Sequence, residues 1–248
     1  MDPSIQIVNL SHEFDGRPVL KNIELSVQTG EILVVMGSSG GGKTTLLKCV
    51  GGLIIPTSGD VFVHGHNFRT EPDKARHHVG FVFQQAALFD SMTVEENVVF
   101  GALRKSHMGS REAKQTAEVL LTQVGLPGIQ NQMPDALSGG MRKRVGLARA
   151  LAMQPDVILF DEPTSGLDPV TAYAIDQLIV QTRDHVGAAC IVVSHDISSV
   201  LRVADTVLFL HQGDAVFLGS TKDFRHAEHP AIQELIGKSR AETLESRW

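Results

Sequence analysis

The sequence predicts an α/β fold with a mainly parallel central sheet. Continuous apolar runs at 32–36, 157–160 and 191–193 indicate buried strands, and apolar residues at helical spacing follow two of them, at 175–179 and 197–201. Strands that are apolar throughout and are separated by helices are typical of a parallel sheet covered on both faces. We therefore expect helices on both sides of this sheet.

The first third of the chain contains predicted strands in which apolar and polar residues alternate. Apolar residues alternate with polar ones at 5–10 and 19–27, and two shorter strands are expected at 60–63 and 79–83. Towards the end of the predicted domain, the segment 206–218 is expected to form a β-hairpin with its turn at a glycine. Strands therefore dominate both ends of the predicted domain.

A helical part interrupts these strands in the middle of the chain. Thr93 and Glu96 have the spacing of a capping box, which marks the start of a helix. We expect a helical insert over about 87–155, within one large domain at 1–220. A charged and partly helical tail at 221–248 should follow this domain.

Composition and charge exclude several classes of protein. Of the 248 residues, 42% are apolar and 20% charged, as in ordinary globular proteins, and the two cysteines lie far apart in apolar stretches, as buried reduced thiols do. The net charge of -6, without a long basic run, argues against nucleic acid as a partner. No stretch approaches the roughly 20 apolar residues that span a bilayer, and the start does not resemble a signal peptide. We expect a cytosolic chain that reaches any membrane through another subunit.

A glycine-rich segment after the strand at 32–36 matches the phosphate-binding loop pattern, and a predicted helix follows it. Its glycines let backbone N–H groups point at phosphates, and the helix presents its positive end to them. Lys43 is expected to hold the β and γ phosphates, and Thr44 to bind Mg²⁺ through its hydroxyl. The residues expected to bind ATP in this segment are Gly37, Ser38, Ser39, Gly40, Gly41, Gly42, Lys43, Thr44 and Thr45.

Two carboxylates end the buried strand at 157–160, where open parallel sheets place their ligands. Asp161 is the candidate for orienting a hydrated Mg²⁺ ion. Glu162 is then placed to polarise an attacking water, because phosphoryl transfer requires an aligned nucleophile. The pair therefore predicts nucleotide hydrolysis rather than binding alone.

Ser138, Gly139 and Gly140 open a second helix that could bind an anion at its positive end. Four basic side chains follow on that helix, and we expect them to form a solvated or ion-paired face rather than to contact phosphate. These basic residues are Arg142, Lys143, Arg144 and Arg149.

Together with the phosphate loop, the acid pair and His195, the segment 137–141 resembles the signature motif of ABC ATPases, with Met141 in place of the usual glutamine. The resemblance extends over about 5–219. It implies the ABC type of P-loop NTPase fold, in which an antiparallel β subdomain and an inserted helical subdomain accompany the core sheet. It also implies an ATPase that uses ATP and Mg²⁺.

The resemblance assigns further roles. Gln84 is similar to the Q-loop residue, which contacts Mg²⁺ and reports the nucleotide state to a membrane subunit. The segment 165–168 resembles the D-loop, which crosses the dimer. His195 is similar to the switch histidine at the γ phosphate, which with Glu162 completes the expected catalytic pair. Phe14 lies where the family keeps an aromatic ring on adenine, although it could instead pack on the sheet.

In this family two chains pair head to tail. Each ATP is therefore expected between the phosphate loop of one chain and Ser138, Gly139, Gly140 and Asp168 of a second copy. The γ phosphate supplies charge that two helix ends can share, so ATP should hold the dimer together and hydrolysis should weaken it.

Three segments, 83–89, 137–141 and 160–169, are similar to the ATPases of the Mla and Mce phospholipid transport systems. The methionine at the end of the signature, Met141, is the most specific of these similarities. That similarity implies an integral membrane permease of the MlaE type and an Mce-domain lipid-binding protein as partners. The chain would then lie at the cytoplasmic face of the bacterial inner membrane, with the permease's coupling helix at 90–98.

Other readings stay open. ATPases of polar amino-acid importers share the Glu-Pro-Thr-Ser run but usually end the signature in glutamine. A DNA-repair ABC ATPase should carry long coiled-coil insertions or a basic groove, and the sequence has neither. A soluble P-loop kinase would give no role to 137–141 or to His195. Lipid transport ranks first among these, amino-acid import second.

Overall fold

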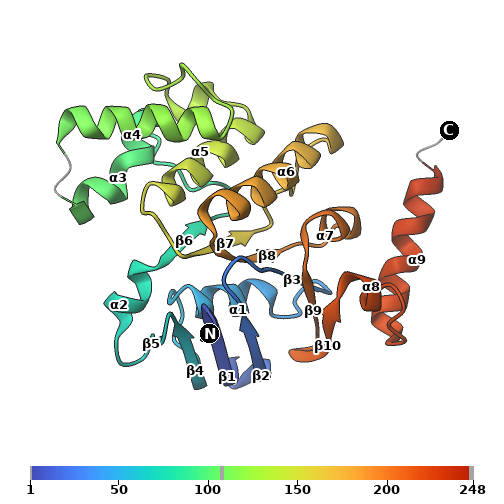
Figure 1. Ribbon diagram of the computed structural model, residues 1–248. Coiled ribbons are helices and arrows are strands. Elements are labelled where there is room, and N and C mark those ends of the chain that lie inside the picture. The colour runs from blue at the N-terminus through green and yellow to red at the C-terminus, as the bar shows by residue number, and fades with distance from the viewer. Residues whose placement is uncertain (1, 107–108, 246–248) are drawn as a thin grey trace.

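The computed structural model describes residues 2–106 and 109–245, and a six-stranded sheet forms its centre (Figure 1). The strands lie in the order β10-β9-β3-β8-β7-β6, and β10 alone runs antiparallel to its neighbour in this sheet. The expected mainly parallel sheet is confirmed. Its strands are β3 (Ile32–Gly37), β6 (Val79–Val82), β7 (Val157–Asp161), β8 (Ala189–Val193), β9 (Thr206–His211) and β10 (Asp214–Ser220).

A second, antiparallel sheet of four strands accompanies it, in the order β2-β1-β4-β5. Strand β5 and helix α2 were not expected, because segments this short carry no readable periodicity. The strands of this sheet are β1 (Ile5–Phe14), β2 (Arg17–Val27), β4 (Ser58–Val63) and β5 (His66–Asn67).

Helices cover the central sheet on both faces, as its uninterrupted apolar strands require. Leu33 and Val35 pack with α1 and the antiparallel sheet, whereas Ile32 and Val34 pack with α3 to α7 on the other face (Figure 1). The helices are α1 (Lys43–Val50), α2 (Pro72–His77), α3 (Val94–Ser106), α4 (Ser110–Gln123), α5 (Gly139–Leu151), α6 (Pro169–Val186), α7 (Ile197–Val203), α8 (Thr221–Phe224) and α9 (Pro230–Glu245).

Local sequence signals explain where two of these helices begin. The backbone N–H of Thr93 donates to the Glu96 carboxylate at 2.7 Å, and the N–H of Glu96 donates to the Thr93 hydroxyl at 3.2 Å, which confirms the capping box ahead of α3. Asp168 caps α6, and Pro169 is its first residue. Each boundary therefore follows from the satisfaction of free backbone N–H groups.

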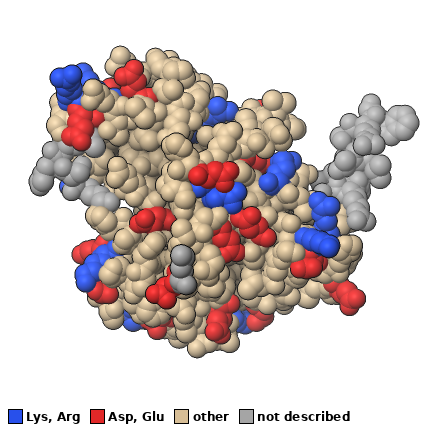
Figure 2. Space-filling model, viewed as in Figure 1, with Lys and Arg blue, Asp and Glu red and all other residues tan. Residues whose placement is uncertain are grey.

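The surface carries charges of both signs, and on the face shown in Figure 2 acidic and basic side chains are interspersed. Cys49 and Cys190 are both buried as expected, and burial raises the pKa of each thiol to about 12. Over the part of the chain that the structure describes, every helix is too short or too polar to cross a bilayer.

A buried ion pair joins α6 to α7. The Asp176 carboxylate is fully buried, and it accepts hydrogen bonds from Arg202 at 2.6 and 2.8 Å and from the Ser199 hydroxyl at 2.6 Å. A buried carboxylate requires such partners, because an unpaired charge in the interior is costly. The pair therefore fixes α7 against α6 just after His195.

We predict that Arg202→Met lowers the free energy of unfolding by about 3 kcal/mol, because it leaves the Asp176 carboxylate buried without its cation. Urea denaturation followed by circular dichroism measures this change. Lys238→Met, which removes an exposed pair with Glu234, is the control and should leave the midpoint unchanged. Equal midpoints for Arg202→Met and the wild type would contradict the prediction.

Candidate functional site

The register of three parallel strands brings the candidate residues to one edge of the central sheet. Val35 of β3 pairs with Val193 of β8, which pairs in turn with Asp161 of β7. Because parallel strands end at the same edge, the loops that follow them meet there. The phosphate loop, Glu162 and His195 lie on these three loops.

The phosphate loop occupies 37–42 and leads into α1. Gly42 caps α1 at φ 96°, and a Cβ there would lie 2.7 Å from the Val19 carbonyl oxygen; a Cβ at Gly37 would lie 2.1 Å from the Leu210 carbonyl oxygen. Glycine is therefore required at both positions. The loop borders a cavity of about 360 Å³, which is lined by 39–45, Val19 and Glu162.

Lys43 lies under this loop. Its ammonium donates hydrogen bonds to the carbonyl oxygens of Gly37 at 3.0 Å and Ser38 at 2.9 Å. Burial lowers the pKa of Lys43, and the nearby carboxylates of Glu162 and Asp161 oppose that shift. A cation beside a helix start and a glycine cradle fits the phosphates of a nucleotide.

Thr44, which lines the same cavity, contacts Asp161 at the end of β7. The Thr44 hydroxyl donates to the Asp161 carboxylate at 3.2 Å, and Asp161 is 7% exposed. Burial raises the pKa of Asp161, and the hydrogen bond from Thr44 opposes this shift. A hydroxyl and a carboxylate next to a phosphate cradle are the oxygen ligands that suit Mg²⁺, so the donor set fits the expected ion.

Gln84 and His195 both approach the Glu162 carboxylate. Gln84 Nε2 donates to Glu162 Oε2 at 3.0 Å, and His195 Nδ1 lies 3.6 Å from the same oxygen. The backbone of Glu162 is left-handed, with φ 45°, and its N–H donates to the Val193 carbonyl oxygen at 3.1 Å. The structure thus brings together three residues that the sequence separates widely.

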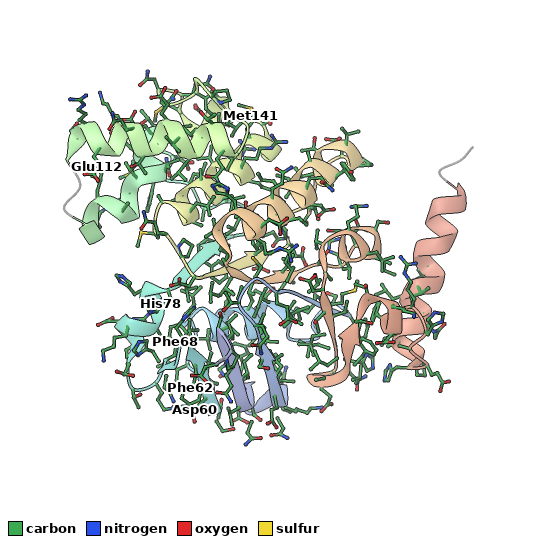
Figure 3. All side chains as sticks on the ribbon, in the orientation of Figure 1. Asp60, Phe62, Phe68, His78, Glu112 and Met141 are labelled. Carbon is green, nitrogen blue, oxygen red and sulfur yellow. The ribbon has the colours of Figure 1, made fainter. Side chains whose placement is uncertain are left out.

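The signature segment lies apart from this cavity within one chain. Ser138 caps α5 by accepting a hydrogen bond from the Met141 N–H at 3.2 Å, and none of Ser138, Gly139 and Gly140 lines the cavity at the phosphate loop. Met141 lies among the helices, on the opposite side of the molecule from Asp60 of β4 (Figure 3). The expected binding of this segment to the ATP of a second copy stays a prediction.

Asp168 and Phe14 also lie outside the cavity at the phosphate loop. The Asp168 carboxylate accepts hydrogen bonds from the Val170 and Thr171 N–H groups, and the pKa of Asp168 is lowered by hydrogen bonding to Thr171. Phe14 ends β1 with 47% of its surface exposed, and its ring packs in a T-shaped arrangement with the His12 ring, with 4.5 Å between the ring centroids. Their assigned roles in ATP binding stay predictions.

The expectation of a solvated basic face on α5 is wrong for Lys143. Its side chain is buried, and its ammonium donates to the carbonyl oxygens of Ser165 at 2.6 Å and Glu162 at 3.3 Å. Lys143 lies at helical spacing from Gly140 and Leu147, which are also buried, and this spacing was the signal that could have located it.

The expectation is also wrong for Arg149. Its guanidinium donates to the carbonyl oxygens of Ala86 and Ala87, both at 2.7 Å, and burial lowers its pKa. Ala86 and Ala87 have φ of 61° and 47°, so this guanidinium holds a segment with an unusual backbone just after Gln84. The side chains of Lys143 and Arg149 are long enough to extend from α5 to the loops that follow Glu162 and Gln84, where they donate to backbone carbonyl oxygens.

Comparisons with known proteins agree with this geometry. The family model for ABC transporters matches residues 20–165. The arginine transport ATP-binding protein ArtM of Bacillus subtilis is 39% identical over 89% of this chain and 92% of its own length. The intermembrane phospholipid transport ATP-binding protein MlaF of Escherichia coli is 36% identical over 94% of this chain and 88% of its own.

A solved structure is similar over nearly its whole length. The ATP-binding cassette MJ0796, seen as a dimer after hydrolysis with ADP and phosphate bound, has a TM-score of 0.80 and 32% identity, covering 88% of this chain and 98% of that one. Together with the phosphate loop and the acid pair, these similarities identify the reaction as ATP hydrolysis with Mg²⁺. The chain therefore belongs to the ABC transporter family, as an ATP-binding subunit that hydrolyses ATP.

Proposed function

We propose that this chain works as an ATP-sandwiched homodimer that energises a membrane permease, and that the transported cargo is phospholipid. The observation that carries the proposal is that Lys43, Thr44 and Glu162 line one cavity, and that Asp161 accepts a hydrogen bond from the Thr44 hydroxyl. That arrangement supplies a phosphate cradle, oxygen ligands for a cation and a base for water.

Different residues around the cavity bind the phosphates and the Mg²⁺ ion. Lys43 holds the β and γ phosphates together with the backbone N–H groups of the loop. Thr44, Asp161 and Gln84 would hold Mg²⁺, and the bound ion would supply positive charge against the phosphates. Gln84 also contacts Glu162, so its position can report whether the nucleotide is present.

Glu162 acts as the base that orients and polarises the attacking water. One oxygen of its carboxylate, Oε2, has two neighbours, the Gln84 amide and the His195 ring. His195 contacts the γ phosphate and, by its approach to the same carboxylate oxygen, limits where the base can point. In-line attack then depends on positioning rather than on covalent chemistry.

The second copy completes each nucleotide site. Ser138, Gly139 and Gly140 of that copy present the positive end of α5 to the γ phosphate, and Asp168 lies beside it. Phe14 stacks on the adenine. The charge of the γ phosphate is thus shared by two chains, so ATP binding closes the dimer and hydrolysis opens it.

We predict that Glu162→Gln retains ATP but hydrolyses it at least about a hundredfold more slowly, because the amide cannot accept a proton from water. Phosphate release measures the rate, and light scattering with ATP and Mg²⁺ should detect a stable dimer. Glu118→Gln, at an exposed position of α4, is the control and should hydrolyse normally. Turnover of Glu162→Gln at the wild-type rate would remove Glu162 from this role.

Lys43→Ala should weaken nucleotide binding by about tenfold to a hundredfold, since it deletes charge-assisted hydrogen bonds to the phosphates. Titration with a fluorescent ATP analogue gives the affinity. The matched control is Lys74→Ala, an exposed lysine paired with Glu71 on α2. An affinity equal to that of the control would show that Lys43 does not hold the phosphates.

The phospholipid cargo rests on the signature and on similarity. Met141 ends the signature as in the Mla and Mce systems, and MlaF is 36% identical over nearly the whole chain. We propose a permease of the MlaE type and an Mce-domain protein as partners, at the cytoplasmic face of the bacterial inner membrane. Import of polar amino acids is the second candidate, because ArtM is 39% identical.

We propose that the coupling helix of the permease docks at 90–98, within a helical subdomain at about 87–155 of a domain at 1–220; the tail at 221–248 follows. Asn97 gives the docking segment a defined shape. It is fully buried, accepts from the Phe89 N–H at 2.8 Å, and donates to the carbonyl oxygens of Met92 and Thr93 at 3.1 and 3.0 Å. A loop ordered in this way suits the transmission of a domain movement.

Co-purification of the intact complex from membranes, with mass spectrometry of bound lipids and subunits, tests the cargo. We expect an Mce-domain protein and phospholipid to accompany the chain. A periplasmic amino-acid receptor in their place would assign the chain to amino-acid import instead.

A further inference from the structure

Lys143 links the signature helix to the loop that carries the proposed catalytic base. It lies one helical turn beyond Gly139 in α5, with 8% of its surface exposed. Its ammonium donates to the carbonyl oxygens of Ser165, at 2.6 Å, and Glu162, at 3.3 Å. These two carbonyls bracket one turn, which the Ser165 N–H closes by donating to the Glu162 carbonyl oxygen at 3.2 Å.

The ammonium binds backbone oxygens rather than side chains. Burial lowers the pKa of Lys143, and the charge of Glu162 opposes that shift. A buried cation is a poor source of stability, since an apolar side chain of similar size often serves a fold equally well. What the cation adds is a fixed orientation for the two peptide groups that it binds.

The orientation of the Glu162 peptide matters because its backbone is left-handed. A residue other than glycine or asparagine rarely adopts φ 45°, so the surrounding contacts must hold it there. The Val193 carbonyl oxygen binds the Glu162 N–H on one side, and Lys143 binds the Glu162 carbonyl on the other. The direction of the carboxylate follows from this backbone.

The same helix also holds the segment after Gln84. Arg149 donates to the carbonyl oxygens of Ala86 and Ala87 at 2.7 Å. Gln84 in turn donates to the Glu162 carboxylate at 3.0 Å. Two basic side chains of one helix thus bind the loop that carries the proposed base and the loop that carries Gln84.

We propose that Lys143 is a positioning residue that holds Glu162 in its working orientation from the signature helix. The inference rests on the proposed function of Glu162. Ser138, the N-cap of α5, is proposed to contact the ATP bound by the partner copy, so a rigid α5 connects one nucleotide site to the base of the other. Lys143 is the contact through which that state reaches Glu162.

Lys143→Met removes the cation and keeps an unbranched apolar side chain that is only one heavy atom shorter. In the purified full-length chain we expect kcat for ATP hydrolysis to fall by about tenfold to a hundredfold, as a misplaced base allows. The affinity for a fluorescent ATP analogue should change by less than about twofold. Within the residues that the structure describes, the Lys143 ammonium donates to Glu162 and Ser165 and not to the phosphate loop.

Two further variants separate positioning from general damage. Arg144→Met removes a partly buried cation of the same helix that donates to the Val124 carbonyl oxygen, away from Glu162, and should hydrolyse normally. Lys143→Arg retains a charged donor and should recover most of the lost rate. Circular dichroism melting curves establish that each variant is folded.

Combining Lys143→Met with Glu162→Gln tests whether the lysine acts through Glu162. The double variant should be within about twofold of Glu162→Gln alone, whereas independent effects would multiply.

A wild-type kcat for folded Lys143→Met, beside an impaired Glu162→Gln, would overturn the assignment of Lys143 while leaving the proposed function intact. Equal loss in Lys143→Met and Lys143→Arg would overturn it as well, and so would a loss of ATP affinity as large as the loss of kcat. A wild-type rate for Glu162→Gln would instead remove the proposed base, and the assignment of Lys143 with it.

Discussion

The register of β3, β8 and β7 is the constraint on which the rest of the site depends. Val35, Val193 and Asp161 lie side by side across these strands, so the phosphate loop, His195 and Glu162 leave the sheet at a common edge. A shift of one strand by one residue would move its core residues to the other face and misplace the loop that follows it. Burial of both sheet faces therefore fixes the strand register, and the register fixes the relative positions of the loops that carry the site residues.

Buried charges at this edge are satisfied by backbone as much as by side chains. Lys43 and Lys143 both donate to carbonyl oxygens, from α1 and α5 respectively, and Asp161 accepts from Thr44. Such an arrangement contributes little stability but holds loops in defined positions. Glu162, with its left-handed backbone, interacts electrostatically with both lysines, and Lys143 also binds its backbone carbonyl oxygen.

Contiguous sequence predicted much of the fold and of the site, because a phosphate loop, a strand that ends in acids and a capped helix are each local patterns. Contacts between distant segments were not predictable in this way. The hydrogen bond from Gln84 to Glu162 joins residues 78 positions apart, and the burial of Lys143 depends on how α5 packs. Sequence alone predicts that a basic residue on an amphipathic helix is solvated, because the groups that its long side chain contacts are known only from the tertiary structure.

The claim that two chains share each ATP is tested most directly by mixing two defective variants in a Glu162→Gln background, one with Lys43→Ala and one with Ser138→Arg. Neither alone can build a complete site, but a mixed dimer can build one from the intact loop of one chain and the intact helix end of the other. We expect light scattering to show ATP-dependent dimers in the mixture and not in either variant alone. Failure of the mixture to dimerise would contradict a nucleotide held between two chains.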